Sequence, residues 1–167
     1  MPILDQNTLD IISHSVEQTR RLGHRLGHLL RPGDVICLEG DLGTGKTCLA
    51  QGVGEGLGVQ QPITSPSFTL VLEYRTGPGR PPLYHIDLYR LDEGVAEALA
   101  FGLEEYLYGD GVCLIEWAER AASIVPAERL WITLRHLQAT KRSLLLHAAG
   151  ARYEQLLRRF RQTAFGL

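Results

Sequence analysis

The spacing of apolar residues divides the chain into helices and strands, and the first long segment has helical spacing. From Ile12, apolar or small residues recur every three or four positions as far as Leu30, which predicts an amphipathic helix over residues 12–30. The Arg31–Asp34 segment, which contains a Pro-Gly pair, ends this helix.

A short apolar run follows from Val35 to Leu38, directly before a glycine-rich turn. Such a run is typical of a strand that is buried on both faces of a parallel sheet. A second helix is predicted over residues 46–57, where Gly58 and the Gln60–Pro62 segment close it.

The rest of the chain continues to alternate between strand and helix. Strands are predicted over residues 68–74 and 82–89, and the Gly- and Pro-rich loop between them indicates an antiparallel hairpin. The remaining predicted elements are a helix over 93–108, strands over 112–115, 130–135 and 143–148, and a final helix over 151–161. This order predicts an α/β fold with a largely parallel central sheet and antiparallel strands at its margins.

Length and composition are typical of a single globular domain that spans residues 1–167. Apolar residues make up 44% of the chain, the formal net charge is −2, and a chain of this length buries about 70% of the surface that it would expose unfolded. The sequence has no apolar stretch of about 18 residues and no basic region followed by an apolar run, so we expect a cytoplasmic protein without a membrane anchor. The three cysteines form no CxxC pair, so we expect reduced thiols.

The glycine-rich turn carries the clearest chemical signal. Residues 40–47 read Gly-Asp-Leu-Gly-Thr-Gly-Lys-Thr, which fits the pattern GxxxxGK[ST] between a buried strand and a helix. Backbone N–H groups of such a loop point inward, and the helix that follows adds the positive end of its dipole. The Lys46 ammonium can reach the β and γ phosphates of a nucleotide, and the Thr47 hydroxyl is a hard oxygen ligand for Mg²⁺. The motif therefore predicts a phosphate-binding loop within a three-layer fold of the P-loop NTPase type.

Two acidic residues compete for the second position beside magnesium. Asp87 and Glu116 each follow a largely apolar strand. Either one alone could be an ordinary strand-end acid that faces water. Together they suggest a division of roles, in which one carboxylate orients the water shell of the metal and the other orients or deprotonates the attacking water.

The remaining motifs favour ATP as the nucleotide. A GTPase reads guanine with an N-K-x-D element, but the only asparagine is Asn7, with no lysine at such a position. The chain also lacks an ABC-type signature and is too short for an AAA-type module. Two alternative functions stay open: a small P-loop kinase, although residues 93–108 hold no arginine for a lid, and an ATP-dependent adaptor with negligible hydrolysis.

Five segments, in order, resemble the signatures of the TsaE (YjeE) family of ATPases. They are Gly40–Thr47, Ser65–Leu70, His85–Arg90, Gly102–Tyr106 and Ile115–Trp117, and the resemblance covers residues 23–150 or so. Four positions depart from the family pattern without removing a phosphate or metal ligand: Thr44, Cys48, Ser67 and Ala118. Of these, Cys48 could alter the contacts to the α-phosphate.

The resemblance implies the ATPase that acts with the TsaB–TsaD complex in forming threonylcarbamoyladenosine in tRNAs that read ANN codons. ATP and Mg²⁺ would be its cofactors, and ATP hydrolysis, expected to be weak without partners, would reset the complex. The tRNA would be reached through the complex, and we expect the chain alone to be a monomer.

The resemblance also implies roles for individual residues. Lys46, Asp87 and Glu116 would be catalytic, with Glu116 polarising the water, while Thr47, Asp87 and Glu116 would surround Mg²⁺. The Ser65–Thr69 loop would be a switch that senses the γ-phosphate. The implied nucleotide-binding residues are Asp41, Leu42, Gly43, Thr44, Gly45, Lys46, Thr47, Cys48, Ser65 and Ser15, the last because residues 13–19 match the family's segment near the adenine base.

Two clusters of basic residues have less specific interpretations. Residues 135–167 carry a net charge of +6, which tRNA phosphates or an acidic partner would fit, but we favour an amphipathic helix with a solvated arginine face. His24 and His28 are spaced four residues apart on one helix. Because no third ligand accompanies them, we favour a solvated face, with Gly23 and Gly27 permitting close helix packing.

Overall fold

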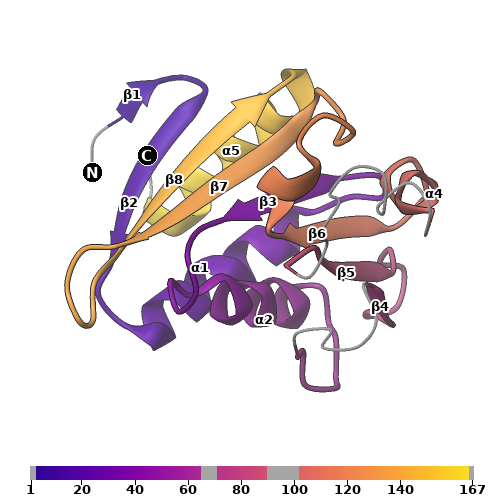
Figure 1. The fold of residues 1–167 in the computed structure, drawn as a ribbon, viewed down its shortest axis with the longest axis horizontal. Coiled ribbons are helices and arrows are strands. Elements are labelled where there is room, and N and C mark those ends of the chain that lie inside the picture. The colour runs from indigo at the N-terminus through magenta and orange to yellow at the C-terminus, as the bar shows by residue number, and fades with distance from the viewer. Residues whose placement is uncertain (1–2, 65–70, 90–101, 166–167) are drawn as a thin grey trace.

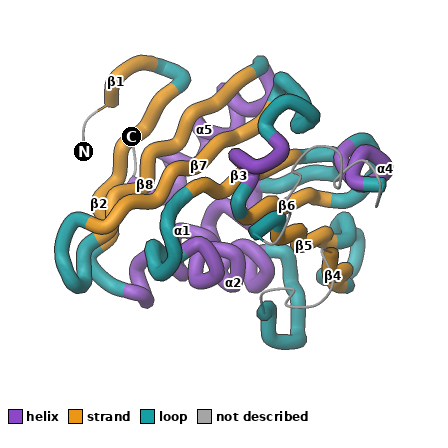
Figure 2. The backbone as a smooth tube through the Cα atoms, viewed as in Figure 1, coloured by secondary structure: helices purple, strands orange, loops and turns teal. Residues whose placement is uncertain are grey.

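The computed structural model describes residues 3–64, 71–89 and 102–165, and within these ranges eight strands form one sheet (Figures 1 and 2). The strand order is β1-β2-β8-β7-β3-β6-β5-β4. The four strands β7, β3, β6 and β5 run parallel to one another, and the other neighbours are antiparallel. The strands are β1 (Ile3–Asp5), β2 (Thr8–Ser13), β3 (Val35–Glu39), β4 (Val71–Tyr74), β5 (Leu83–Asp87), β6 (Val112–Glu116), β7 (Arg129–His136) and β8 (Arg142–Ala149). The predicted parallel centre and antiparallel margins are confirmed.

Helices cover both faces of the centre, so the predicted three layers are present. The helices α1 (Val16–Leu29), α2 (Lys46–Gly56) and α5 (Ala151–Phe165) contribute to one apolar core, and α4 (Leu103–Leu107) and the 3-10 helix η1 (Ala118–Ala121) contribute to the other (Figure 1). In β3, Ile36 and Leu38 belong to the first core and Val35 and Cys37 to the second, as the alternation of a strand requires. None of the described helices is long and apolar enough to cross a membrane.

The predicted helix over residues 12–30 begins later than expected. Its first part belongs to β2, which pairs antiparallel with β8 and which the helical spacing concealed. The helix itself begins at Val16, because the Ser15 side chain caps it by accepting a hydrogen bond from the Gln18 N–H at 3.0 Å.

The side chains of β2 explain why the helical interpretation of this segment was wrong. Leu9 and Ile11 point into the core, with 0% and 4% exposure, whereas Ile12 points away and is 47% exposed. The apolar stripe of α1 therefore does not include Ile12. Ile12 is apolar although it faces outward, so its distance from Val16 matches the spacing of a helix only by coincidence.

Other boundaries differ less. The hairpin of β4 and β5 is confirmed, although residues 68–70 of its predicted first strand lie outside the described residues. The helix predicted over 93–108 is not continuous, because Gly102 adopts a left-handed conformation (φ 86°) directly before α4, and residues 93–101 lie outside the described residues. The final helix continues past residue 161 to Phe165, where Ala164 packs against the core.

Four glycines allow α1 and α2 to pack with their backbones in contact. Gly23 and Gly27 of α1 face Gly52 and Gly56 of α2. A Cβ atom at Gly52 would lie 2.1 Å from the Arg20 carbonyl oxygen, and one at Gly27 would lie 2.3 Å from a carbonyl oxygen of α2. The predicted role of the α1 glycines in close packing is confirmed, and this contact places α2 and the loop before it.

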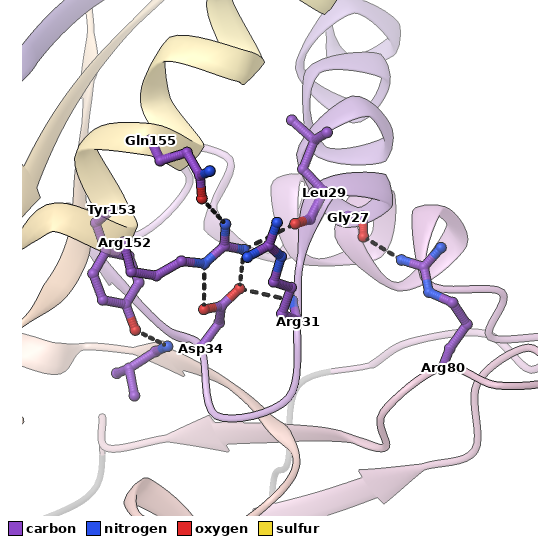
Figure 3. A network of polar contacts seen from close by, with 9 residues as sticks. Gly27, Leu29, Arg31, Asp34, Arg80, Arg152, Tyr153 and Gln155 are labelled. Carbon is purple, nitrogen blue, oxygen red and sulfur yellow. Dashed lines mark hydrogen bonds and ion pairs between the residues drawn. The ribbon is translucent and has the colours of Figure 1, made fainter.

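A partly buried ion pair joins the N-terminal end of α5 to the loop between α1 and β3 (Figure 3). Arg152 donates to both Asp34 carboxylate oxygens, at 3.0 and 2.7 Å, and to the Leu29 carbonyl oxygen at 3.0 Å. Beside it, the Tyr153 hydroxyl accepts the Val35 N–H at 2.8 Å, and burial raises the pKa of Tyr153 to about 12. Arg152 is therefore a structural anchor, not part of the predicted solvated arginine face, although Arg158 and Arg159 are exposed as expected.

Candidate nucleotide-binding site

The glycine-rich loop joins β3 to α2, as the sequence pattern requires. Gly45 precedes the helix in a left-handed conformation (φ 104°), which side chains rarely adopt. The loop is closed upon itself, because the N–H and the hydroxyl of Thr44 both donate to the Asp41 carbonyl oxygen, at 3.3 and 2.8 Å. Gly40 lies against β7, the neighbour of β3 in the sheet, and a Cβ atom at Gly40 would be 2.6 Å from the Leu134 carbonyl oxygen.

Lys46 is almost fully buried at the first position of α2, with 5% exposure. Its ammonium donates to the carbonyl oxygens of Gly40 and Asp41, and it lies 4.2 Å from the centre of the Trp117 ring. Burial lowers the pKa of the Lys46 ammonium, and the Glu116 carboxylate is the strongest of the charges that oppose this shift. The cation thus lies within the loop itself, next to where the sequence predicts phosphate.

The three predicted magnesium-side residues gather at one edge of the sheet. Parallel pairing of β5 with β6 sets Asp87 opposite Glu116, and the Thr47 hydroxyl donates to Glu116 Oε1 at 3.2 Å. Glu116 is 2% exposed, and Asp87 accepts the Tyr89 N–H at 2.9 Å. Burial raises the pKa of the Asp87 carboxyl, and the nearby Glu116 adds to this effect.

This set of oxygens fits Mg²⁺. In the part of the chain that the structure describes, no group of three or more His, Cys, Asp or Glu residues forms a metal cage. Magnesium does not need one, because it is usually held by one or two carboxylates together with waters and substrate phosphates. One hydroxyl and two carboxylates beside a phosphate loop are donors of that kind.

The sequence analysis missed a role for His85. This residue is fully buried on β5, and its Nε2 atom lies 2.5 Å from Glu116 Oε2. His85 precedes Asp87 by two residues, so both side chains leave the strand on the same face. That spacing within an otherwise apolar strand was the signal that could have identified it.

Trp117 also has a defined place in the site. It is the only non-glycine residue of the described ranges with positive φ (59°), which turns the chain sharply after Glu116. The turn sets its indole over Lys46 and beside the Tyr89 ring, with centroids 4.9 Å apart. An aromatic layer therefore covers the lysine.

A cavity of about 320 Å³ opens beside the loop, on the side of the antiparallel margin. Its lining brings together Ser15, Cys48, Gly43 and Gly45, which the sequence analysis assigned to nucleotide binding from distant segments. Arg142 of β8 completes the wall and lies 3.5 Å from the Gly43 carbonyl oxygen. Leu42, by contrast, is 64% exposed at the tip of the loop, and Ser65 lies outside the described residues, as does the whole predicted switch loop.

The other candidate ligands do not form a site. His24 and His28 are both exposed on α1, with their rings 4.8 Å apart, and no third ligand joins them among the residues described. Cys37 and Cys113 are buried free thiols, and burial raises the pKa of each to about 12.

The chain is similar to proteins of one known family. The family model described as threonylcarbamoyl adenosine biosynthesis protein TsaE matches residues 13–144. The chain is 42% identical to a tRNA threonylcarbamoyladenosine biosynthesis protein TsaE from Bacillus subtilis, over 84% of this chain and 85% of that protein. It is 44% identical to the protein of the same name from Treponema pallidum, over 80% of this chain and 96% of that one.

The fold is also similar to a solved structure. The crystal structure of YdiB from Bacillus subtilis superimposes with a TM-score of 0.78 at 38% identity, and the match covers 94% of this chain and 96% of that chain. The family match extends over most of the residues that build the nucleotide site, from the cap of α1 to β8. The chain therefore belongs to the TsaE family, whose role is in tRNA threonylcarbamoyladenosine biosynthesis.

Proposed function

We propose that this protein is a Mg²⁺-dependent ATPase that works with the TsaB–TsaD complex in forming threonylcarbamoyladenosine in tRNAs that read ANN codons, its ATP hydrolysis resetting the complex. The observation that carries the proposal is the meeting of Thr47, at the start of α2, with the buried Glu116 at the end of β6, 3.2 Å apart. A phosphate loop that faces a buried carboxylate is suited to hydrolysis of a phosphoanhydride, because binding alone does not require that carboxylate.

The loop and Lys46 would bind the phosphates. The backbone N–H groups at the start of α2 and the positive end of its dipole would face the phosphate oxygens. Lys46 would exchange its two carbonyl contacts for the β and γ phosphates, which are stronger acceptors because they are charged. Ser15 and Cys48 would then line the space for the nucleoside, in the cavity beside the loop.

Glu116 would orient and polarise the attacking water, and Asp87 would help to hold the metal. Glu116 is held in place from two sides, by Thr47 and by His85, whereas Asp87 lies across from it on β5. Bound Mg²⁺ would neutralise charge that develops on the β and γ phosphates. Thr47, Asp87 and Glu116 are the residues that would hold it.

The partner assignment rests on family membership. The names of the relatives place those proteins in tRNA threonylcarbamoyladenosine biosynthesis. In this proposal the chain does not transfer the threonylcarbamoyl group, because its own chemistry would be limited to ATP, Mg²⁺ and water. It would drive a cycle of the partner complex instead.

The test is the ATPase rate of the purified protein with and without the TsaB–TsaD pair from the same source, with Lys46→Ala as the blank. We expect a weak rate alone, stimulation by the pair, and loss of both in the variant. A high rate that the pair leaves unchanged would refute the role in the complex. Full tRNA modification by Glu116→Ala would instead support an adaptor that binds ATP without useful hydrolysis.

A further inference from the structure

His85 is a polar residue in an apolar environment. It lies on β5 between Leu83 and Asp87 in the series that faces α2, and it pairs with Leu114 of β6. Leu83, Leu114 and His85 are all fully buried. An imidazole in such a place must find hydrogen-bond partners inside the protein, since water does not reach it.

Within the described residues, the ring makes one hydrogen bond, and it is directed to the proposed catalytic carboxylate. His85 Nε2 lies 2.5 Å from Glu116 Oε2, and because a carboxylate only accepts, Nε2 is the protonated nitrogen of this bond. The other nitrogen, Nδ1, is buried without a hydrogen-bond partner among the described residues. Among the described residues, Glu116 is therefore the one hydrogen-bond partner of the ring. A buried apolar residue would fill the same space without leaving a nitrogen unpaired.

We propose that His85 is a positioning residue for ATP hydrolysis, acting by holding Glu116 Oε2 so that Oε1 stays directed towards Thr47 and the phosphate loop. This inference rests on the proposed ATPase function. Glu116 has several rotatable bonds, and Thr47 constrains only one of its two oxygens, at 3.2 Å. The Nε2–H group of His85, on β5, constrains the second oxygen, so the plane of the Glu116 carboxylate is defined.

A positioning role for His85 predicts different effects on kcat and on ATP affinity, whereas a merely structural role does not. His85 does not line the cavity beside the loop, and its hydrogen bond does not involve Lys46. Loss of the donor should therefore reduce kcat and leave ATP affinity unchanged. Removal of an interaction that orients an active group costs about 10- to 100-fold in activity.

The matched variants are His85→Gln and His85→Asn. Both carry a neutral amide, but only the glutamine amide nitrogen reaches the place of the imidazole Nε2, since the asparagine side chain is one carbon shorter. We expect His85→Asn to lower kcat about 10- to 100-fold and His85→Gln to restore most of it. ATP affinity, measured by titration calorimetry in the presence of Mg²⁺, should stay within about twofold in both, because neither variant alters the loop.

The measurement uses the full chain with the TsaB–TsaD pair, and thermal unfolding of each variant checks that it is folded. Equal kcat values for the two variants would overturn the proposal, as would a loss of ATP affinity at unchanged kcat. Lys46→Ala and Glu116→Gln separate this inference from the proposed function. The proposed function fails if the unchanged protein with the pair hydrolyses ATP no faster than Lys46→Ala. An active unchanged protein and an inactive Glu116→Gln, together with a normal His85→Asn, overturn only the role of His85.

Discussion

Replacing Gly52 by alanine should destabilise the protein, although helix propensity alone predicts the opposite. Gly52 lies in the interior of α2, where alanine would ordinarily stabilise a helix by about 1 kcal/mol relative to glycine. Here the added Cβ would lie 2.1 Å from the Arg20 carbonyl oxygen of α1 and 3.0 Å from the His24 nitrogen. Both obstacles are backbone atoms, so neither can move aside by rotating a side chain.

The size of the effect follows from this geometry. Ordinary contact begins at 3.4 Å, so a Cβ at 2.1 Å is about 1.3 Å too close and the two helices must separate or tilt. Overpacking of this kind costs up to about 3 kcal/mol, and the gain in helix propensity of about 1 kcal/mol offsets part of it. We therefore expect the free energy of unfolding to fall by about 2 kcal/mol, which lowers the midpoint of a urea transition by about 1 M.

The matched control is Gly54→Ala in the same helix. Its Cβ would meet the end of the Ile63 side chain, at 1.9 Å from Cδ1, and that side chain can adopt another rotamer. Both variants gain the same helix propensity, so urea unfolding followed by circular dichroism should show a larger loss for Gly52→Ala. An equal or higher free energy of unfolding for Gly52→Ala than for the unchanged protein would refute the backbone contact between α1 and α2.

Three further predictions concern single side chains. Arg152→Met should lower the free energy of unfolding by about 2–3 kcal/mol, because it leaves the Asp34 carboxylate, 4% exposed, without its cation, and urea unfolding measures this. A thiol reagent at pH 8 should modify the half-buried Cys48, slowly because burial raises the pKa of this thiol too, but neither of the two fully buried cysteines until the protein unfolds; ATP should slow the reaction further, and Cys48→Ser should abolish it. Because burial raises the pKa of Asp87 above its usual 3.8, the folded protein binds its proton more tightly than the unfolded chain, and stability falls as pH rises through that window. In the protein without nucleotide and metal, Asp87→Asn should therefore raise the thermal midpoint at pH 7, and the gain should disappear as the pH approaches 3.8.

The elements that the sequence predicted well are those whose pattern has one explanation. The run from Val35 to Leu38 and the glycine-rich turn after it predicted a buried strand followed by a loop and a helix, and these three elements are present. The segment near Ile12 was ambiguous, because this outward-facing isoleucine of β2 extended the helical spacing of α1 by one position. Pairing with β8, more than a hundred residues away, decided the matter, and no local pattern contains that information.

In the candidate site, too, some features follow from local sequence patterns and others depend on contacts between distant segments. The sequence predicted that Asp87 and Glu116 would both act at a magnesium site. The structure brings them together because the carboxyl ends of neighbouring parallel strands share one edge of a sheet. It did not predict that His85 would hold Glu116, because that bond depends on which side chains share one face between two strands. Nor did it predict that Trp117 would cover Lys46, which depends on a positive φ that tryptophan rarely adopts.

The position of each residue in the sheet implies a division of labour within the site. Glu116, Asp87 and His85 lie on central parallel strands, and the sheet has an apolar core on each of its two faces. The wall of the cavity comes instead from the margin, where the loop before α1 meets the β7–β8 hairpin and Arg142 lies 3.5 Å from the Gly43 carbonyl oxygen. The cavity wall and the carboxylates thus come from different elements of the structure. Substitutions in the wall should therefore alter ATP affinity, and substitutions among the central residues should alter the rate of hydrolysis.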